Sequence, residues 1–527
     1  MKHMIVGPAF AAALIAAAAS AQTPQKGGVF TVAIDGPRHL NPAVQSGNAT
    51  GIPGVQIFAG LVELDAAFQP QPYLADSWTV SDDGLIYEFR LNEAAVFHDG
   101  QPVTSADVAY SLGVVKANHP FGIAMFGAVD RVETPDPKTV RIVLSAPSPA
   151  LMASLSPVLL PILPKHVYDD GQEIKTHPAN SRPVGSGPFM FEEYIEGRYV
   201  SVKAFPDFFR EGRPYLDEIV FRIMPETEQQ SRLISIEAGE VDYLPFSGMN
   251  SRNVERLKQR SDLTVTTDGF GAIGPVNYLE FNLRQPPFDN ILVRRALAHM
   301  IDRDFITRAL HRGQSKRLDG PLHSSSPFYD AGALTRYEVD PEKAKALLSE
   351  AGYEPGANGI RFKMVLDIPT THPESGKLVA EYLKSRLAEI GIEVELRPTP
   401  DFATWAKRIA DWSYEATMSS AFNYPDPIIG VHRLFLCANI RNVVWSNTEG
   451  YCNETLDATL KTAASATDME TRRAAYSEFQ RIITEDLPMI FTNEEPYTAV
   501  YRDNVMDPPL TVWGAMQPMD GVWLKTE

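Results

Sequence analysis

The segment 405–427 contains the polar and aromatic side chains best suited to contact a polar ligand. It begins as a short amphipathic helix that carries Trp405 and Trp412, continues as the β-prone run 415–420, and ends in Asn-Tyr-Pro-Asp-Pro at 423–427. Two prolines that bracket an aspartate fix φ, and they continue neither a helix nor a central strand. The sequence therefore predicts a rigid, extended corner at the end of a strand.

This corner offers groups that could hold a polar solute. Its small residues would let a ligand approach the backbone, its amide would form hydrogen bonds, and its tyrosine would form an aromatic wall. The residues concerned are Ser419, Ser420, Ala421, Asn423 and Tyr424. Trp405 and Trp412 could stack on a flat ligand, but packing in the core explains each of them equally well. An ordinary exit from a strand into a loop is the alternative interpretation of the segment.

No motif in the chain predicts catalysis. The run 269–274 has the G-x-G-x-x-G spacing of a dinucleotide-binding loop, which needs a helix N-terminus directly after it. Pro275 and the strand-like run 276–281 follow instead, so we expect these glycines to serve a chain crossing between domains.

Metal-binding and nucleophile motifs are also missing from the sequence. It contains no H-E-x-x-H, G-x-S-x-G or P-loop pattern, and its eleven histidines include no pair at i, i+3 or i, i+4. His432, close to the corner, is expected to be an exposed loop histidine. We predict no enzyme activity, no resident metal and no cofactor.

Length and charge narrow the class of protein. A chain of 527 residues is too long for one hydrophobic core, so two or three domains are expected. The formal net charge of −18 argues against binding to nucleic acid and to anionic membrane surfaces. Neither property identifies a ligand.

Residues 1–21 predict a cleavable secretory signal. Lys2 and His3 precede an apolar run at 4–19, which leads into an Ala-Ser-Ala cleavage site. The run is shorter than the roughly 20 apolar residues that span a bilayer. We expect the mature chain to begin at Gln22, to carry no lipid anchor because no cysteine lies near the cleavage site, and to be free in a periplasm.

Cys437 and Cys452 are the only two cysteines. In an oxidising compartment they could form a disulfide, which would brace the corner at 423–427. Two free, buried thiols are the alternative.

Capping signals and apolar spacing predict alternating helices and strands. Helices are expected at 104–116, from Thr227 to Gly239, after Asn290, from Asp340 to Gly352, at 375–390 and at 469–485. Strands are expected at 29–34, 61–65, 77–91 (a hairpin), 139–144, 219–224, 241–244 and 392–396. The segment 219–244 reads as a β-α-β unit. This alternation is typical of an α/β fold with mixed sheets.

Eight segments occur in an order that is specific when they are taken together. They are LADSWTVSDDGLIYEFRL, VFHDGQPVTSADVAYSL, PVGSGPF, PYLDEIVFRI, IEAGEVDYL, FNLRQPPFDNILVRRALAHMIDR, DPEKAKALLSEAGY and the NYPDP corner. In this order the chain resembles the large extracytoplasmic solute-binding proteins of the peptide/nickel/opine class, family 5, the receptors of ABC importers. The resemblance implies a two-lobed α/β fold of the large, class II periplasmic-binding-protein type, with mixed sheets and an inserted subdomain.

The resemblance also implies how the chain is divided. Lobe I would comprise 22–54, 184–273 and 496–527, an inserted subdomain would occupy 55–183, and lobe II would run from 274 to 495. Hinge strands near 272–277 and 494–497 would let the lobes close over one ligand. Asn277 and Tyr497 would face the cleft at these hinges, and His39, after the first strand, is a weaker candidate for ligand contact.

The corner differs from that of peptide-binding relatives in one residue. Their corner usually reads A-D-Y-x-D-P, and its first aspartate pairs with the α-ammonium of the peptide. Asn423 matches that position, and an amide cannot form the same charge-assisted bond. The resemblance therefore favours neutral or anionic polar ligands, such as sugars, opine-like conjugates or modified peptides. It implies that Asp426 is structural.

The function implied by the resemblance is solute capture. A monomeric periplasmic protein would bind a polar solute (peptide, opine-like or sugar-like) between its lobes and deliver it to an ABC permease in the inner membrane, with no nucleic-acid partner. A secreted hydrolase acting on a similar substrate is the alternative, and a chaperone- or sensor-like use of the same cleft is a third interpretation. Binding of nickel with a small chelator stays open.

Overall fold

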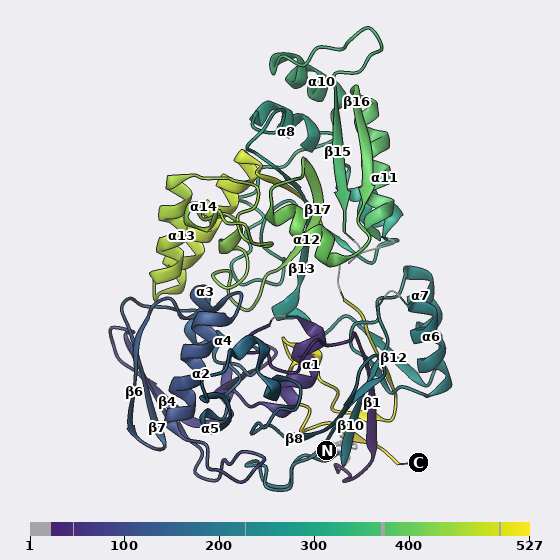
Figure 1. The fold of residues 1–527 in the computed structure, drawn as a ribbon. Helices are drawn as coiled ribbons and strands as arrows, with labels where there is room; N and C mark the ends of the chain where they lie inside the picture. The colour runs from purple at the N-terminus through teal and green to yellow at the C-terminus, as the bar shows by residue number, and fades with distance from the viewer. Residues whose placement is uncertain (1–22, 46, 227, 370–374, 495–496, 527) are drawn as a thin grey trace, which may run out of the picture.

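The chain folds into a lower and an upper part (Figure 1), and the region where the two parts meet is called the waist. The structure is a computed structural model, and it describes residues 23–45, 47–226, 228–369, 375–494 and 497–526. The lower part is built on two larger sheets and the upper part on one, and two pairs of short strands, β2 (Val62–Leu64) with β3 (Pro70–Pro72) and β20 (Val505–Met506) with β21 (Trp523–Leu524), form further small sheets.

A seven-stranded mixed sheet forms one half of the lower part. Its order is β12-β19-β11-β1-β10-β9-β8, with the bounds Leu263–Thr266, Ala499–Arg502, Tyr243–Leu244, Val29–Ile34, Glu218–Ile223, Tyr199–Ala204 and Phe189–Ile195. β1 runs parallel to both β10 and β11, which explains its largely apolar sequence VFTVAI. Helix α6 (Gln229–Ala238) joins β10 to β11 and ends at Gly239, so the predicted β-α-β unit is confirmed. The predicted capping residue Thr227 lies outside the described residues.

A four-stranded antiparallel sheet forms the other half of the lower part (Figure 1). Its order is β4-β5-β7-β6, with the bounds Ala75–Val80, Ile86–Leu91, Thr139–Leu144 and Val129–Asp136. Helix α2 (Ser105–Asn118) opens with the predicted capping box of Thr104 and Asp107. Shorter elements complete this half: α1 (Asn48–Ile57), β2 (Val62–Leu64), β3 (Pro70–Pro72), α3 (Gly122–Phe126), α4 (Leu151–Ser154) and α5 (Lys165–Tyr168).

A six-stranded mixed sheet forms the upper part. Its order is β14-β18-β13-β17-β15-β16, with the bounds Lys316–Arg317, Met489–Glu494, Pro275–Phe281, Ala416–Phe422, Phe362–Ile368 and Ile392–Pro398. The helices around it include α8 (Ile291–Ala298), α10 (Pro341–Glu350), α11 (Ser375–Ala388), α12 (Phe402–Ala410), α13 (Glu454–Ser465) and α14 (Met469–Asp486). Asn290 and Asp340 cap α8 and α10 with their side chains, as predicted.

The chain crosses from the lower to the upper part at β13. Ile273 belongs to the hydrophobic core of the lower part, and Val276, three residues later, belongs to a core of the upper part. A short 3-10 turn, Gly271–Ile273, leads directly into β13, so no helix follows the glycine motif. This confirms that the motif serves a chain crossing and not a dinucleotide.

The three larger sheets fall inside the ranges predicted for lobe I, the inserted subdomain and lobe II. The exact bounds of those domains stay a prediction, and the second predicted hinge lies partly outside the described residues. The signal at 1–21 lies outside them as well. Within the described ranges, no helix combines the length and the apolar character needed to cross a membrane.

Two histidines of the lower part, the half-buried His98 and the buried His119, form hydrogen bonds with neighbouring backbone groups. Nδ1 of His98 accepts a hydrogen bond from the Gly185 N–H at 3.2 Å, and Nε2 contacts the Gly187 carbonyl at 3.0 Å. Nδ1 of His119 accepts from the Phe121 N–H at 3.1 Å. Burial lowers the pKa of His98 to about 4 and the pKa of His119 to about 3.

We expect acid to destabilise the protein in a defined pH window. Below about pH 6.5 these histidines take up a proton in the unfolded chain but not in the folded one, so the free energy of unfolding falls as the pH falls. Each histidine contributes a slope of up to about 1.4 kcal/mol per pH unit. Urea unfolding between pH 7 and 5 measures this slope, and the variant His119→Gln should show a shallower one. A free energy of unfolding that does not change over this range would contradict the prediction.

Candidate functional site

The corner at 423–427 follows β17 directly and lies at the waist. β17 pairs with β13, so that Ser420 stands opposite Asn277 and Ala421 opposite Val276. After the strand, Tyr424 adopts a φ of 54°, in the left-handed region, and the Asp426 carboxylate accepts from the Ile428 N–H at 3.0 Å. The prediction of an extended corner is therefore wrong, because the hydrogen bonds of the aspartate close a tight turn.

Asn423 is only 3% exposed. Its Oδ1 accepts a hydrogen bond from the His323 N–H at 3.0 Å, and this donor fixes the orientation of the amide. Its Nδ2 is buried and has no hydrogen-bond partner among the described residues. The unpaired group of Asn423 is therefore a donor. Gly274 makes this arrangement possible, since a Cβ there would lie 2.7 Å from the His323 ring.

Aromatic side chains join the two parts at the waist. The Tyr424 ring lies edge-on to Phe121 at a centroid distance of 5.1 Å, and 6.1 Å from Trp513. The Tyr497 ring lies 6.1 Å from Phe422. Burial raises the pKa of Tyr424 to about 12, so its hydroxyl stays protonated at neutral pH. Tyr424 and Tyr497 thus take part in contacts between the two parts.

Other predicted residues lie inside the upper part. Asn277 and Ser419 line a cavity of about 30 Å³, together with Met418, His311 and Asn493. A cavity of that size holds one or two water molecules and no larger solute. The side chain of Ala421 packs in a hydrophobic core of the upper part. Contact of these residues, or of Ser420, with a solute stays a prediction.

The structure does not bring the two tryptophans or His39 to the corner. Trp405 is 2% exposed and its Nε1 donates to the Thr417 hydroxyl at 2.9 Å, as a core residue does. Trp412 lies beyond the end of α12, where its φ of 58° ends the helix, and the Arg284 guanidinium covers its ring at 3.9 Å. The prediction that the helix carries Trp412 is therefore wrong. His39 is half-buried in the turn after β1.

Two residues after Tyr424 serve the structure of the corner. Asp426 forms a buried salt bridge with Arg472 of α14 at 2.7 Å, which agrees with the structural role that the resemblance implies. His432 is 3% exposed and packs against Tyr476 at 5.5 Å. The expectation of an exposed loop histidine is wrong, because the chain turns back onto α14 after the corner.

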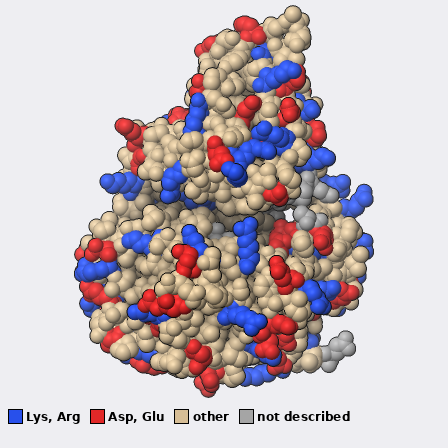
Figure 2. All heavy atoms as spheres, in the orientation of Figure 1, with Lys and Arg blue, Asp and Glu red and all other residues tan. Residues whose placement is uncertain are grey.

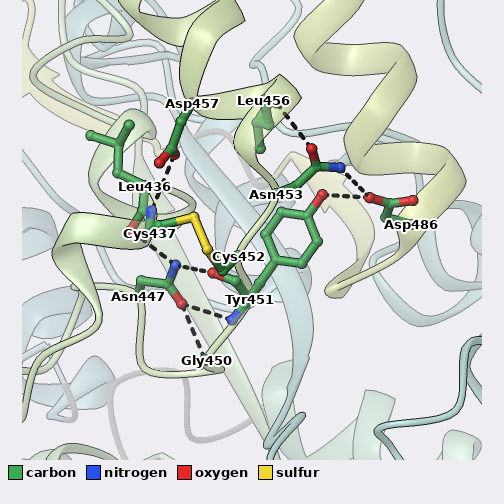
Figure 3. Close-up of a disulfide and its surroundings, with 10 residues drawn as sticks. All are labelled: Leu436, Cys437, Asn447, Gly450, Tyr451, Cys452, Asn453, Leu456, Asp457 and Asp486. Carbon is green, nitrogen blue, oxygen red and sulfur yellow. Dashed lines mark hydrogen bonds between the residues drawn. A yellow bond between two sulfur atoms is a disulfide. The ribbon is translucent and has the colours of Figure 1, made fainter.

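A disulfide closes the loop that leads from the corner to α13 (Figure 3). Cys437 and Cys452 are bonded, with their Cα atoms 4.7 Å apart. Within this loop the Asn447 side chain donates to the Tyr451 carbonyl at 2.6 Å. The Tyr451 hydroxyl donates to the Asp486 carboxylate at the end of α14. The bridge therefore holds the loop against the helix pair that supports the corner.

Sequence reasoning missed one contact at the waist. Arg433 is 9% exposed, and its guanidinium carbon lies 4.5 Å from the centre of the Phe121 ring. The two residues are some three hundred positions apart, and they meet only where the lower and upper parts touch. No local pattern in the sequence marks such a pair.

The lower part contains a larger cavity of about 270 Å³ beside Trp513. Four of the charged residues on its wall form ion pairs, Asp520 with Arg213 at 3.0 Å and Arg210 with Glu63 at 2.9 Å, and Asp507 adds one more carboxylate. No group of three histidine, cysteine or acidic side chains in the described part of the chain is arranged to hold a metal ion.

A protein-family model and several known proteins match this chain over most of its length. The model of the bacterial extracellular solute-binding proteins, family 5 middle region, matches residues 69–442. The heme-binding protein A of Haemophilus influenzae is 28% identical over 483 residues, which are 86% of this chain and 84% of that protein. A putative ABC transporter peptide-binding protein of Brucella ovis is 30% identical and covers 80% of this chain and 78% of its own length.

Solved structures share the fold over nearly the whole chain. AgaA from A. tumefaciens R10, in complex with agropinic acid, is 25% identical with a TM-score of 0.80, over 95% of this chain and 99% of that one. NikZ from Campylobacter jejuni, in complex with Ni(L-His), has a TM-score of 0.82 at 22% identity, over 93% and 97% of the two chains. These neighbours establish the predicted two-lobed α/β fold.

We expect the disulfide to contribute measurably to stability. The bridged cysteines are 15 residues apart, and a loop of that size restrains the unfolded chain by about 3 kcal/mol. The double variant Cys437→Ser, Cys452→Ser should lose about that much free energy of unfolding in urea. Reductant should bring the wild type down to the same value and leave the variant unchanged. Equal urea midpoints for the oxidised wild type and the variant would contradict this.

Proposed function

Because this chain belongs to the bacterial extracellular solute-binding proteins of family 5, and is thus the binding component of an ABC importer, we propose that it captures a polar solute that needs no free amine. The solute would be neutral or anionic and would lie between the lobes, beside Asn423 and Tyr424. Closure of the lobes over it would be a shift of population toward a closed form that binds it better.

The observation that carries this proposal is the orientation of Asn423. Its Oδ1 is engaged by the His323 N–H, and its buried Nδ2 has no partner among the described residues. A buried donor without an acceptor is costly, so it favours a solute oxygen, carbonyl or carboxylate, over an ammonium group. An aspartate at this position would reverse that preference.

The surface at the waist carries charges of both signs. On the face drawn in Figure 2 a furrow separates the two parts, and basic and acidic side chains both lie along its lower edge. The support for an anionic solute comes instead from relatives. Two relatives carry names of acidic solutes: AgaA was solved with agropinic acid, and a Pectobacterium atrosepticum relative, 27% identical, is named a glutathione-binding protein.

Finer features of the proposal follow from family membership and sequence. The mature protein would begin at Gln22 and act in the periplasm as a monomer, without a lipid anchor and without a nucleic-acid partner. It would release its solute unchanged to an inner-membrane permease. The family and its structural neighbours are transport proteins, which supports this over the alternative of a hydrolase. Lobe bounds at 274 and 495, and an inserted subdomain at 55–183, complete the proposal.

We expect Asn423→Asp to change selectivity toward amines. The aspartate supplies a charged acceptor where the wild type has a donor, so the affinity for Ala-Ala should rise about tenfold or more, and the affinity for N-acetyl-Ala-Ala should not. Isothermal titration calorimetry of both peptides measures the two changes.

The exposed Asn442 provides a matched control, because Asn442→Asp adds the same charge away from the waist. It should alter neither affinity. If Asn423→Asp leaves the binding of every amine-bearing peptide unchanged, Asn423 does not contact the solute.

A further inference from the structure

Arg433 is a buried cation at the waist with few partners. Its Nη1 donates to the Trp445 carbonyl, and its guanidinium carbon lies over the Phe121 ring of the lower part, 4.5 Å from the ring centre. Its Nε is buried without a hydrogen-bond partner, and neither Nε nor Nη2 donates to any residue that the structure describes. One edge of the guanidinium is therefore unpaired.

This edge is the one that other arginines of the chain use to hold carboxylates. Arg317 donates from Nε and Nη2 to the two oxygens of Asp319 at 2.8 and 3.0 Å. Arg397 does the same with Asp367, at 2.8 and 2.6 Å. The planar fork of a guanidinium matches a carboxylate in this two-point geometry.

Arg472 is a buried arginine near the corner whose charge is neutralised by a carboxylate of the protein itself. It is as buried as Arg433, but it pairs with Asp426 at 2.7 Å. No acidic side chain among the described residues forms an ion pair with Arg433. Burial lowers the pKa of Arg433, and only the hydroxyls of Tyr424 and Tyr278 oppose this. A buried charge without a counter-ion is unfavourable unless a ligand supplies one.

We propose that the Nε and Nη2 edge of Arg433 binds a carboxylate of the captured solute, and that Phe121 covers the guanidinium face when the lobes close. The inference rests on the proposed function and narrows it from neutral or anionic solutes to carboxylic acids. The carboxylate would approach in the plane of the guanidinium, which leaves the face free for the ring.

Phe121 links this site to closure. It stands at the start of α3 in the lower part and touches both Arg433 and Tyr424 of the upper part. A cation over an aromatic face is attracted to it, more strongly where water is excluded. In the closed form Phe121 keeps water from Arg433, so a solute carboxylate that pairs with this cation removes the cost of burying it and favours the closed form over the open one.

The test compares acids with their esters. Titration calorimetry of the full mature protein would use glutathione, agropinic acid and N-acetyl-Ala-Ala, the methyl ester of each, and the neutral sugars sucrose and maltose. We expect at least one acid to bind the wild type, with its ester about 10- to 100-fold weaker. Arg433→Gln should lose the same factor for the acid only, and Arg433→Lys, which keeps the charge but not the fork, should fall between them.

Arg441→Gln is the matched control, since it removes the same charge from an exposed position on the same loop. It should leave the acid affinity unchanged. An ester or a sugar that binds the wild type as well as the acids do would overturn the Arg433 site and leave the proposed function standing. If Arg433→Gln binds the acid as tightly as the wild type does, the Arg433 site is likewise overturned and the proposed function stands. The acid and ester comparison on the wild type decides the question even if the variants do not fold. Binding of no compound by the wild type would contradict the proposed function itself.

Discussion

The arrangement of the waist depends on the pairing of three strands. β13 carries the chain upward and is hydrogen-bonded to β17 on one side and β18 on the other. Glu494, at the end of β18, stands opposite Val276, and Phe422, at the end of β17, stands opposite Pro275. One end of this sheet therefore holds three features together: the start of β13, where the chain enters the upper part, the end of β18, and the corner that follows β17. This pairing holds Asn423 and Tyr424 against the lower part.

The charges around the corner divide into compensated and uncompensated ones. Asp426 and Arg472 neutralise each other in the interior, whereas the buried Glu494 carboxylate accepts from the hydroxyl of Ser324 at 2.8 Å and lies 3.5 Å from Nε2 of His323. Arg433 stands outside these pairs and faces the lower part through Phe121. A chain with a net charge of −18 thus keeps one buried cation without an acidic partner, among the described residues, where its two parts meet.

Local chemistry was predictable from the sequence, and contacts between distant segments were not. The caps at Thr104, Asn290 and Asp340 act within three residues, so the sequence alone determined them. The glycine motif at 269–274 could be excluded as a nucleotide site because a strand that begins at Pro275, and not a helix, follows it. The left-handed Tyr424, the burial of His432 and the contact of Arg433 with Phe121 depend on how α14 and α3 pack, which no short pattern encodes. The disulfide was only partly predictable from the sequence, because the spacing of Cys437 and Cys452 permits a bridge but does not require one.

Native mass spectrometry of the mature protein after incubation with a periplasmic extract tests the central claim most directly. The claim is that the closed lobes hold a carboxylic acid that needs no free amine. We expect a retained small molecule of unchanged mass whose fragments show a carboxylate. Retention only of solutes without an acidic group, or of no solute, would contradict it.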